Sequence, residues 1–190
     1  MPELNLVPFI KPGNRQIIFY KIVLLTKTSV MRTKEIKVFV YEYESVSELN
    51  TSDQNLIAEA RKIAQHAYAP YSGFNVGAAL LLENGEIITG NNQENAAFTP
   101  GLCAERVALF YANAVFPQLP VKTIAVTASN KNGLLKETVK PCGSCRQAIL
   151  ETEVRFKRPI RIILEGKKKI QIFEGVENLL PFAFKPESLD

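Results

Sequence analysis

The sequence predicts one α/β domain of three layers, in which helices cover a mixed sheet of five strands. Helical and strand patterns follow one another along residues 51–190 in the order α, β, β, α, β, α, β, β, which is typical of a sheet covered by helices. The chain has 190 residues, of which 46% are hydrophobic. This is enough apolar material for one compact core and too little for two large ones. We therefore expect a single domain over residues 51–190, preceded by a separate segment, residues 1–50.

The helices are predicted from apolar residues at helical spacing. The first begins at "TSDQ", where Thr51 and Gln54 resemble a capping box, and it ends before Pro70. Its stripe consists of Leu56, Ile57, Ala60, Ile63, Ala64 and Ala67. Two more helices are expected to begin at Cys103 and Cys142, and a short one near residues 176–180.

The five strands are predicted from alternating or continuous apolar runs. Residues 74–82 alternate, "ENG" supplies a turn, and residues 86–90 return, which together indicate a β-hairpin. Residues 122–129 are expected to form a third, buried strand, and residues 131–140 a loop. The last two strands flank the turn "EGKKK", residues 165–169.

Residues 1–50 differ from the rest of the chain. Their first fifteen residues contain three prolines and no clear period, whereas residues 36–46 alternate well enough for a strand. Three interpretations stay open: a strand added to the sheet, an assembly element, or an upstream extension with Met31 as the natural start.

Composition argues against nucleic acid and membrane partners. The net charge is +4, but residues 1–40 hold seven Lys/Arg against two Glu, so the remaining chain is close to neutral. The basic cluster at residues 155–169 alternates like a strand, which favours an exposed hairpin over a polyanion site. Lys21 and Lys27 interrupt the longest apolar run, and no signal-peptide cleavage pattern is present. We expect a cytoplasmic protein.

Three cysteines are the strongest candidates for chemistry. Cys103 begins a helix in "CAE", while Cys142 and Cys145 lie at another helix start in "PCGSC". An odd number of cysteines argues against a disulfide framework and favours free thiols, a redox pair or metal ligands. Three thiolates converging from two helix starts suit a catalytic tetrahedral zinc ion, which keeps its fourth position for water. Helix N-termini also stabilise thiolates.

Two charged residues follow Cys103 directly. Glu105 is expected to take a proton from the water at the metal and pass it to a substrate nitrogen. Arg106 lies on the same helix face as Cys103, so we expect its guanidinium to bond the cysteine sulfurs and offset their charge. His66 is the single histidine. It lacks an acidic or metal-ligating neighbour, and we interpret it as a surface or packed imidazole.

The combination of "CAE" with a later "PCxxC" matches the zinc deaminase pattern. Over residues 51–190 the chain resembles the small, homotetrameric, three-cysteine cytidine deaminases. The matching segments are "YAPYSGFNVGAAL", "GNNQENAAF", "LCAERVAL", "PCGSCRQ" and "LLPFAFKPESL". The resemblance implies hydrolysis of cytidine and deoxycytidine to uridine and deoxyuridine with release of ammonia, as in pyrimidine salvage. It also implies one Zn²⁺ per subunit and a homotetramer.

The resemblance further implies the substrate contacts. Phe74 would pack against the pyrimidine ring, and Asn92 and Glu94 would hold the ribose 3′-hydroxyl. The Ala104 amide would meet the pyrimidine carbonyl, and Phe184 would enter a neighbouring subunit's site. From the residues alone, Asn92 and Glu94 point the same way in an extended segment, whereas both phenylalanines are by default core residues.

Other interpretations remain. Within the deaminases, a polynucleotide or an aminonucleoside antibiotic is an alternative substrate. Outside them, the cysteines would form a structural zinc knot, although no fourth ligand is obvious, or a redox site, which tight stoichiometric zinc would exclude. The sequence also departs from several relatives at Phe98, where they carry tyrosine, so a hydroxyl contact there is lost.

Overall fold

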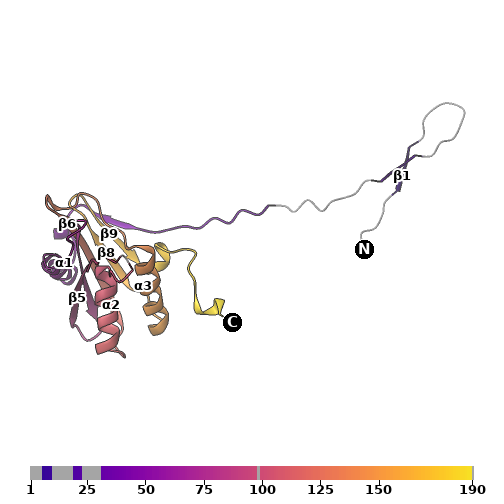
Figure 1. Ribbon diagram of the computed structural model, residues 1–190. Coiled ribbons are helices and arrows are strands. Elements are labelled where there is room, and N and C mark those ends of the chain that lie inside the picture. The colour runs from indigo at the N-terminus through magenta and orange to yellow at the C-terminus, as the bar shows by residue number, and fades with distance from the viewer. Residues whose placement is uncertain (1–5, 10–18, 23–30, 98, 190) are drawn as a thin grey trace, which may run out of the picture. The chain divides into compact units, whose positions relative to one another are not determined.

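The computed structural model describes residues 6–9, 19–22, 31–97 and 99–189 (Figure 1). The chain divides into two compact units, Met1–Glu35 and Ile36–Asp190. In the first unit, β1 (Leu6–Phe9) pairs with β2 (Phe19–Ile22) as an antiparallel hairpin. The second unit contains the sheet, the helices and all the candidate site residues that are described. Phe98 lies outside the described residues.

The second unit is built on a mixed sheet of seven strands. They are β3 (Tyr41–Tyr43), β4 (Asn75–Leu82), β5 (Ile87–Asn91), β6 (Val121–Asn130), β7 (Gly133–Leu134), β8 (Arg161–Glu165) and β9 (Ile170–Glu174). The order is β3-β9-β8-β6-β4-β5, and β7 pairs with β6. The β6–β8 pair is parallel, whereas β4 pairs antiparallel with both of its neighbours.

The predicted mixed sheet with flanking helices is confirmed, but the predicted count of five strands is too low. The additional strands are β3, which pairs with β9 and lies within residues 36–46, and β7, which lies in a segment predicted as a loop. Strand β7 has two residues, and two residues are too few to display the alternation on which a strand prediction depends.

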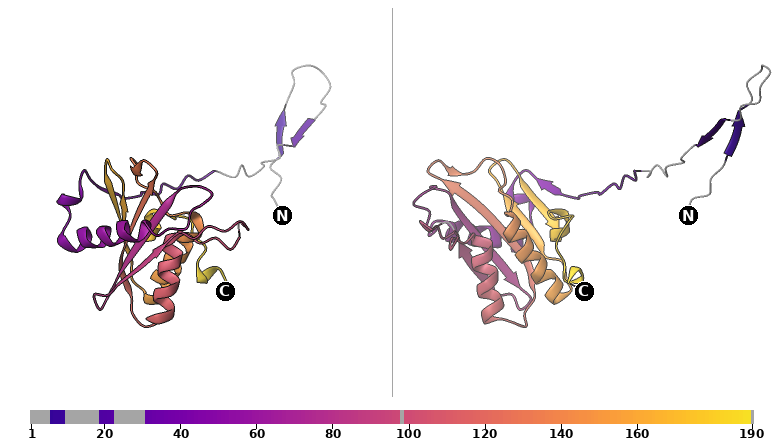
Figure 2. Two further views of the ribbon diagram at one scale, coloured as in Figure 1. Left: turned by 60° about the vertical axis from the view of Figure 1, so that its left-hand side comes forward. Right: turned by 45° about the vertical axis from the view of Figure 1, so that its right-hand side comes forward.

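Helices cover both faces of the sheet (Figure 1). They are α1 (Thr51–Ala64), α2 (Ala104–Val115) and α3 (Gly143–Phe156), with short 3-10 helices η1 (Val46–Glu48), η2 (Val176–Asn178) and η3 (Pro186–Ser188). Helix α1 packs on one face, and α2 and α3 lie side by side on the other (Figure 2). No helix in the described part of the chain is long and apolar enough to cross a membrane.

The start of α1 differs from the predicted capping box. Asn50 is the N-cap, because its backbone is extended and its Oδ1 accepts a hydrogen bond from the Asp53 amide at 2.9 Å. Thr51 is already helical, and the Gln54 side chain donates to the Leu49 carbonyl at 2.7 Å. The helix ends at Ala64, and His66 lies exposed in the turn that follows.

Gly90 on β5 allows α2 to approach the sheet closely. A Cβ at this position would lie 2.6 Å from the Ala108 nitrogen and 2.7 Å from the Ala104 oxygen. The backbone of β5 at Gly90 therefore packs directly against the first turn of α2, and any side chain at position 90 would push that turn outward.

We expect Gly90→Ala to lower the free energy of unfolding by about 2 kcal/mol or more, because a rigid backbone clash must be relieved. Chemical denaturation measures this loss. The matched control is Gly143→Ala, since a Cβ at Gly143 meets nothing within 4 Å. Equal stability of Gly90→Ala and the parent protein would contradict the close-packing argument.

Candidate active site

The starts of α2 and α3 bring the three cysteine sulfurs together. Cys103 is the N-cap of α2 and Cys142 the N-cap of α3, and neither uses its side chain to cap the helix. The Sγ of Cys142 lies 3.7 Å from that of Cys103 and 3.5 Å from that of Cys145. All three sulfurs are within 4.8 Å of one another. Two helix ends separated in sequence thus converge on one point.

The geometry of the sulfurs fits a tetrahedral zinc ion. With Zn–S bonds near 2.3 Å, two sulfurs on a tetrahedron are about 3.8 Å apart, and Cys142 lies 3.7 and 3.5 Å from the other two sulfurs. Among the residues that the structure describes, no fourth His, Cys, Asp or Glu joins the group. An ion held by these three thiolates would keep one coordination position for water.

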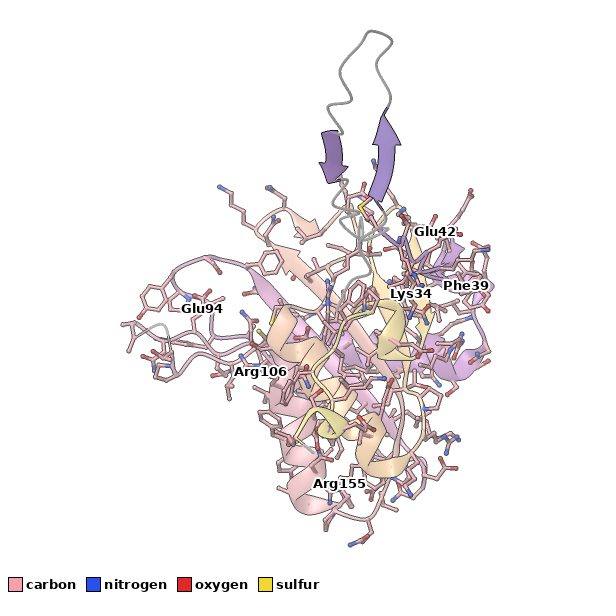
Figure 3. The ribbon with its side chains drawn as sticks, turned by 90° about the vertical axis from the view of Figure 1, so that its right-hand side faces the viewer. Lys34, Phe39, Glu42, Glu94, Arg106 and Arg155 are labelled. Carbon is pink, nitrogen blue, oxygen red and sulfur yellow. The ribbon has the colours of Figure 1, made fainter. Side chains whose placement is uncertain are left out.

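Arg106 lies beside the sulfurs (Figure 3). Its Nη2 donates to the Cys103 Sγ at 3.8 Å. The Cys103 pKa is lowered to about 5 by a hydrogen bond from Cys145 and, in addition, by Arg106. The pKa of Cys145 is raised, because its thiol donates to Cys103 and is buried. Negative charge therefore concentrates on the sulfur that faces the guanidinium.

Glu105 is a buried carboxyl group next to these sulfurs. It occupies the first turn of α2 and its exposed fraction is 4%. Burial raises the pKa of Glu105, and negative charge on the neighbouring Cys103 raises it further. An acidic group held in such surroundings is typical of one that exchanges protons during a reaction.

A cavity of about 540 Å³ connects two of the three cysteines with the predicted substrate residues. Those of the expected site residues that line it are Phe74, Asn92, Glu94, Cys103, Glu105 and Cys142. A volume of this size suits a small organic molecule. The arrangement places a candidate metal centre, a buried carboxyl group and an aromatic side chain around one space.

Asn92 and Glu94 hold the wall of this cavity in place. The Asn92 Oδ1 accepts from the Val76 amide at 2.8 Å, and its Nδ2 donates to the Phe74 carbonyl at 2.9 Å. The Glu94 carboxylate accepts from the Tyr71 amide at 2.9 Å and from the Ser72 hydroxyl. These hydrogen bonds, first the one from Ser72, lower the pKa of Glu94. Both side chains therefore fix the turn before β4 on which Phe74 lies.

Two expected substrate-binding residues, Ala104 and Phe184, are not among the residues that line the cavity. Ala104 is buried as the first residue of α2. Phe184 is 59% exposed in the C-terminal segment, where its carbonyl accepts from the Gln147 side chain of α3 at 2.8 Å. Phe184 is absent from the described lining of its own subunit's cavity, and its insertion into a neighbour stays a prediction.

Sequence reasoning missed part of the cavity wall. Val139 and Lys140 line the cavity beside Cys142, although the sequence pattern predicts only a loop over residues 131–140. Their closeness to Cys142 in sequence is the signal that indicates them, because residues two or three positions before a ligand must pass near its site.

The family model described as "Cytidine and deoxycytidylate deaminase zinc-binding region" matches residues 50–158. The chain is 40% identical over 136 residues to a cytidine deaminase of Sporosarcina psychrophila, covering 72% of this chain and 93% of that protein. It is 41% identical over 138 residues to a cytidine deaminase of Halalkalibacterium halodurans, covering 72% and 97%.

Solved structures agree with these relatives. The crystal structure of cytidine deaminase from Burkholderia pseudomallei superposes with a TM-score of 0.59 at 36% identity, covering 68% of this chain and 97% of that one. A cytidine deaminase structure from Mycobacterium tuberculosis gives a TM-score of 0.54 at 29% identity, covering 69% and 95%. Sequence, fold and the convergence of three cysteines thus lead to one conclusion: this chain belongs to the cytidine deaminase family of zinc-binding enzymes.

Proposed function

We propose that this protein hydrolyses cytidine and deoxycytidine to uridine and deoxyuridine. Water supplies the oxygen that bonds to C4 of the pyrimidine, and the C4–N bond to the amino group breaks, so that ammonia leaves. One observation carries the proposal: two of the three converging cysteines, Cys103 and Cys142, and the buried Glu105 line a cavity sized for a nucleoside.

Cys103, Cys142 and Cys145 would hold one Zn²⁺ per subunit. When bound, the ion would polarise water and make it nucleophilic near neutral pH. Glu105 accepts a proton from the attacking water, delivers it to N3 of the ring, and then carries a proton to the departing amine. Arg106 offsets the negative charge of the three thiolates, which would otherwise make that water less acidic.

The remaining cavity residues would bind the nucleoside. Phe74 packs against the pyrimidine ring, as an aromatic side chain on a cavity wall can. Asn92 and Glu94 hold the ribose 3′-hydroxyl with hydrogen-bonding capacity left over from the turn that they fix. The amide of Ala104 donates to the pyrimidine carbonyl. This set recognises a free nucleoside by its base and its sugar.

The proposal also includes the domain boundaries, the oligomeric state and the cellular location. We place the deaminase domain at residues 51–190, with residues 1–50 as an extension, and we expect a homotetramer in which Phe184 completes a neighbouring site. Phe182 and Phe184, which are 82% and 59% exposed, support this assembly, because two large apolar side chains close together in the C-terminal segment are available for burial against a partner. A site of three reduced thiols suits the cytoplasm. The proposed reaction suits a role in pyrimidine salvage.

The test is a substrate panel. Purified protein is incubated with cytidine, deoxycytidine, CMP, adenosine, an aminonucleoside antibiotic and an oligonucleotide, with and without a chelator, and ammonia release is followed. We expect turnover of the two free pyrimidine nucleosides, with the chelator abolishing it. Preference for the nucleotide, the antibiotic or the oligonucleotide would overturn the proposed substrate, and turnover that survives complete zinc removal would overturn the proposed metal.

A further inference from the structure

We propose that Glu42, on the edge strand β3, positions the segment 135–140 that leads into Cys142. The inference rests on the proposed zinc site and extends it, since it gives the strand before the deaminase domain a role at the metal. Glu42 does not line the cavity, and its side chain bonds to none of the three cysteines. It acts through two buried side chains, and it is therefore a positioning residue.

A line of side-chain hydrogen bonds connects Glu42 with Lys140. The Gln171 Nε2 on β9 donates to the Glu42 Oε1 at 2.5 Å. The Gln171 Oε1 accepts from the Thr138 hydroxyl at 2.5 Å, and that hydroxyl accepts from the Lys140 Nζ at 2.8 Å. Lys140 also donates to the Thr138 carbonyl at 3.2 Å. The line thus begins at the edge strand (Figure 3) and ends two residues before Cys142.

Every hydrogen bond in this line runs in the same direction. Lys140 donates to Thr138, Thr138 to Gln171, and Gln171 to the carboxylate of Glu42, so a cation and an anion close the two ends. Bonds aligned in this way polarise and strengthen one another. Hydrogen bonds from Lys169 and then Gln171 lower the pKa of Glu42, which keeps the accepting end charged.

The two middle members of the line are buried and depend on Glu42. Thr138 is 5% exposed and Gln171 is 8% exposed. A buried amide that loses its acceptor must move to find another, because an unsatisfied buried donor is costly. Removing the Glu42 carboxylate therefore disturbs Gln171, and Gln171 is the acceptor that holds the Thr138 hydroxyl.

The same segment is docked on the turn between β8 and β9. The Lys167 amide donates to the Leu135 carbonyl at 2.8 Å, and the Lys168 amide to the Lys136 carbonyl at 3.1 Å. A Cβ on Gly166 would lie 2.7 Å from the Thr138 nitrogen. The backbone of the turn between β8 and β9 thus packs directly against the backbone of this segment. A small shift of the turn therefore also moves Thr138.

The segment so held forms part of the site. Val139 and Lys140 line the cavity, and Cys142 follows after Pro141. Cys142 is exposed, whereas Cys145 is fully buried within α3. The position of Cys142 is therefore set less by the core than by the chain that leads to it.

The test compares Glu42→Ala with Glu44→Ala in the full-length, zinc-loaded protein. Glu44 is also an exposed glutamate, two residues along. We expect Glu42→Ala to release zinc to a chelator about 3- to 10-fold faster than the parent, which is less than the roughly 10- to 100-fold effect of losing a group bonded directly to a metal ligand, because Glu42 acts through two intervening side chains. Hydrogen exchange of the amides in residues 135–140 is expected to accelerate. Glu44→Ala is expected to match the parent in both measurements.

Further variants separate positioning from other effects. Glu42→Gln keeps an acceptor for Gln171, so it should restore slow zinc release. Lys169→Ala removes the exposed ion pair of Lys169 with Glu42, 2.8 Å long, and should leave zinc release unchanged, because such pairs contribute little. Thr138→Val should reproduce Glu42→Ala, and the double variant should be no worse than either single one. If Glu42→Ala does not fold, Thr138→Val carries the comparison.

Zinc release and exchange rates that are equal in Glu42→Ala and Glu44→Ala would overturn the inference. So would additive effects of Glu42→Ala and Thr138→Val. Both readouts are independent of turnover, so a parent protein that binds zinc but fails to deaminate cytidine would refute the proposed function and leave this comparison intact. Conversely, an active parent with unaffected variants would refute the positioning role alone.

Discussion

Glu105→Gln is expected to lower kcat for cytidine by about 10²- to 10⁴-fold, which is the range that a positioned general acid or base contributes. Glutamine has nearly the same shape as glutamate and can occupy the same buried space in the first turn of α2. It cannot accept a proton from water or hand one to a ring nitrogen. Ammonia release under saturating cytidine measures the loss, and metal analysis of the same sample measures bound zinc.

The zinc content of the Glu105→Gln protein shows whether Glu105 acts in proton transfer or as a metal ligand. Glu105 is absent from the group of ligands that the sulfurs form, so the variant should retain zinc at the parent's stoichiometry. Glu86→Gln is the matched control, because Glu86 is an exposed glutamate in the turn between β4 and β5, and it should keep full activity. A Glu105→Gln protein with near-normal kcat would refute the assigned role, and one without zinc would show that the carboxylate serves the metal instead.

The longest sequence patterns predicted the fold well. The stripe from Leu56 to Ala64 places α1, because apolar residues that recur at this period over several turns are typical of an amphipathic helix. The alternation in residues 74–82 places β4, although the structure buries this strand on both faces, with Ala78 in one core and Ala79 in the other. A central strand between helices buries both sets of side chains. The alternation of larger and smaller side chains along β4 therefore resembles the alternation of buried and exposed side chains that is typical of a strand with one face in water.

Short or nonlocal features could not be predicted from the sequence. The N-cap at Asn50 differs by one residue from the predicted Thr51, since several neighbouring polar residues can cap and the backbone conformation decides among them. The alternation in residues 36–46 indicates a strand there, but it does not indicate that β3 pairs with β9, where the hydrogen bond between Glu42 and Gln171 spans 129 residues. No local pattern encodes such a pairing.

The candidate site was easier to predict than the cavity around it. Three cysteines at two helix starts indicate a shared ion, because a zinc site draws its thiolate ligands from separate segments. The wall formed by Val139 and Lys140 depends instead on how the segment 135–140 docks on the turn between β8 and β9. Docking of this kind is decided by tertiary contacts, and the residues involved carry no distinctive spacing.

Cys145→Ser is expected to abolish stoichiometric zinc binding and, with it, deaminase activity. Cys145 is fully buried, and the hydroxyl of serine is a poor replacement for a thiolate ligand of zinc. Zinc bound by the folded chain alone also stabilises that chain, by about 4 kcal/mol when its concentration is 1,000 times the Kd. The parent protein should therefore lose thermal stability when a chelator is added. The variant should melt at a temperature that chelation no longer changes.

Ser144→Ala is the matched control for this variant. Ser144 is exposed between Cys142 and Cys145 in the first turn of α3, so its substitution perturbs the same turn and leaves all three sulfurs in place. It should retain zinc, activity and the chelator-dependent drop in Tm. Cys145→Ser protein that still binds one zinc ion tightly would mean that two sulfurs suffice or that another group supplies the third ligand. In that case, Cys145 would be a packing residue of α3, and the assignment of all three cysteines as zinc ligands would be wrong.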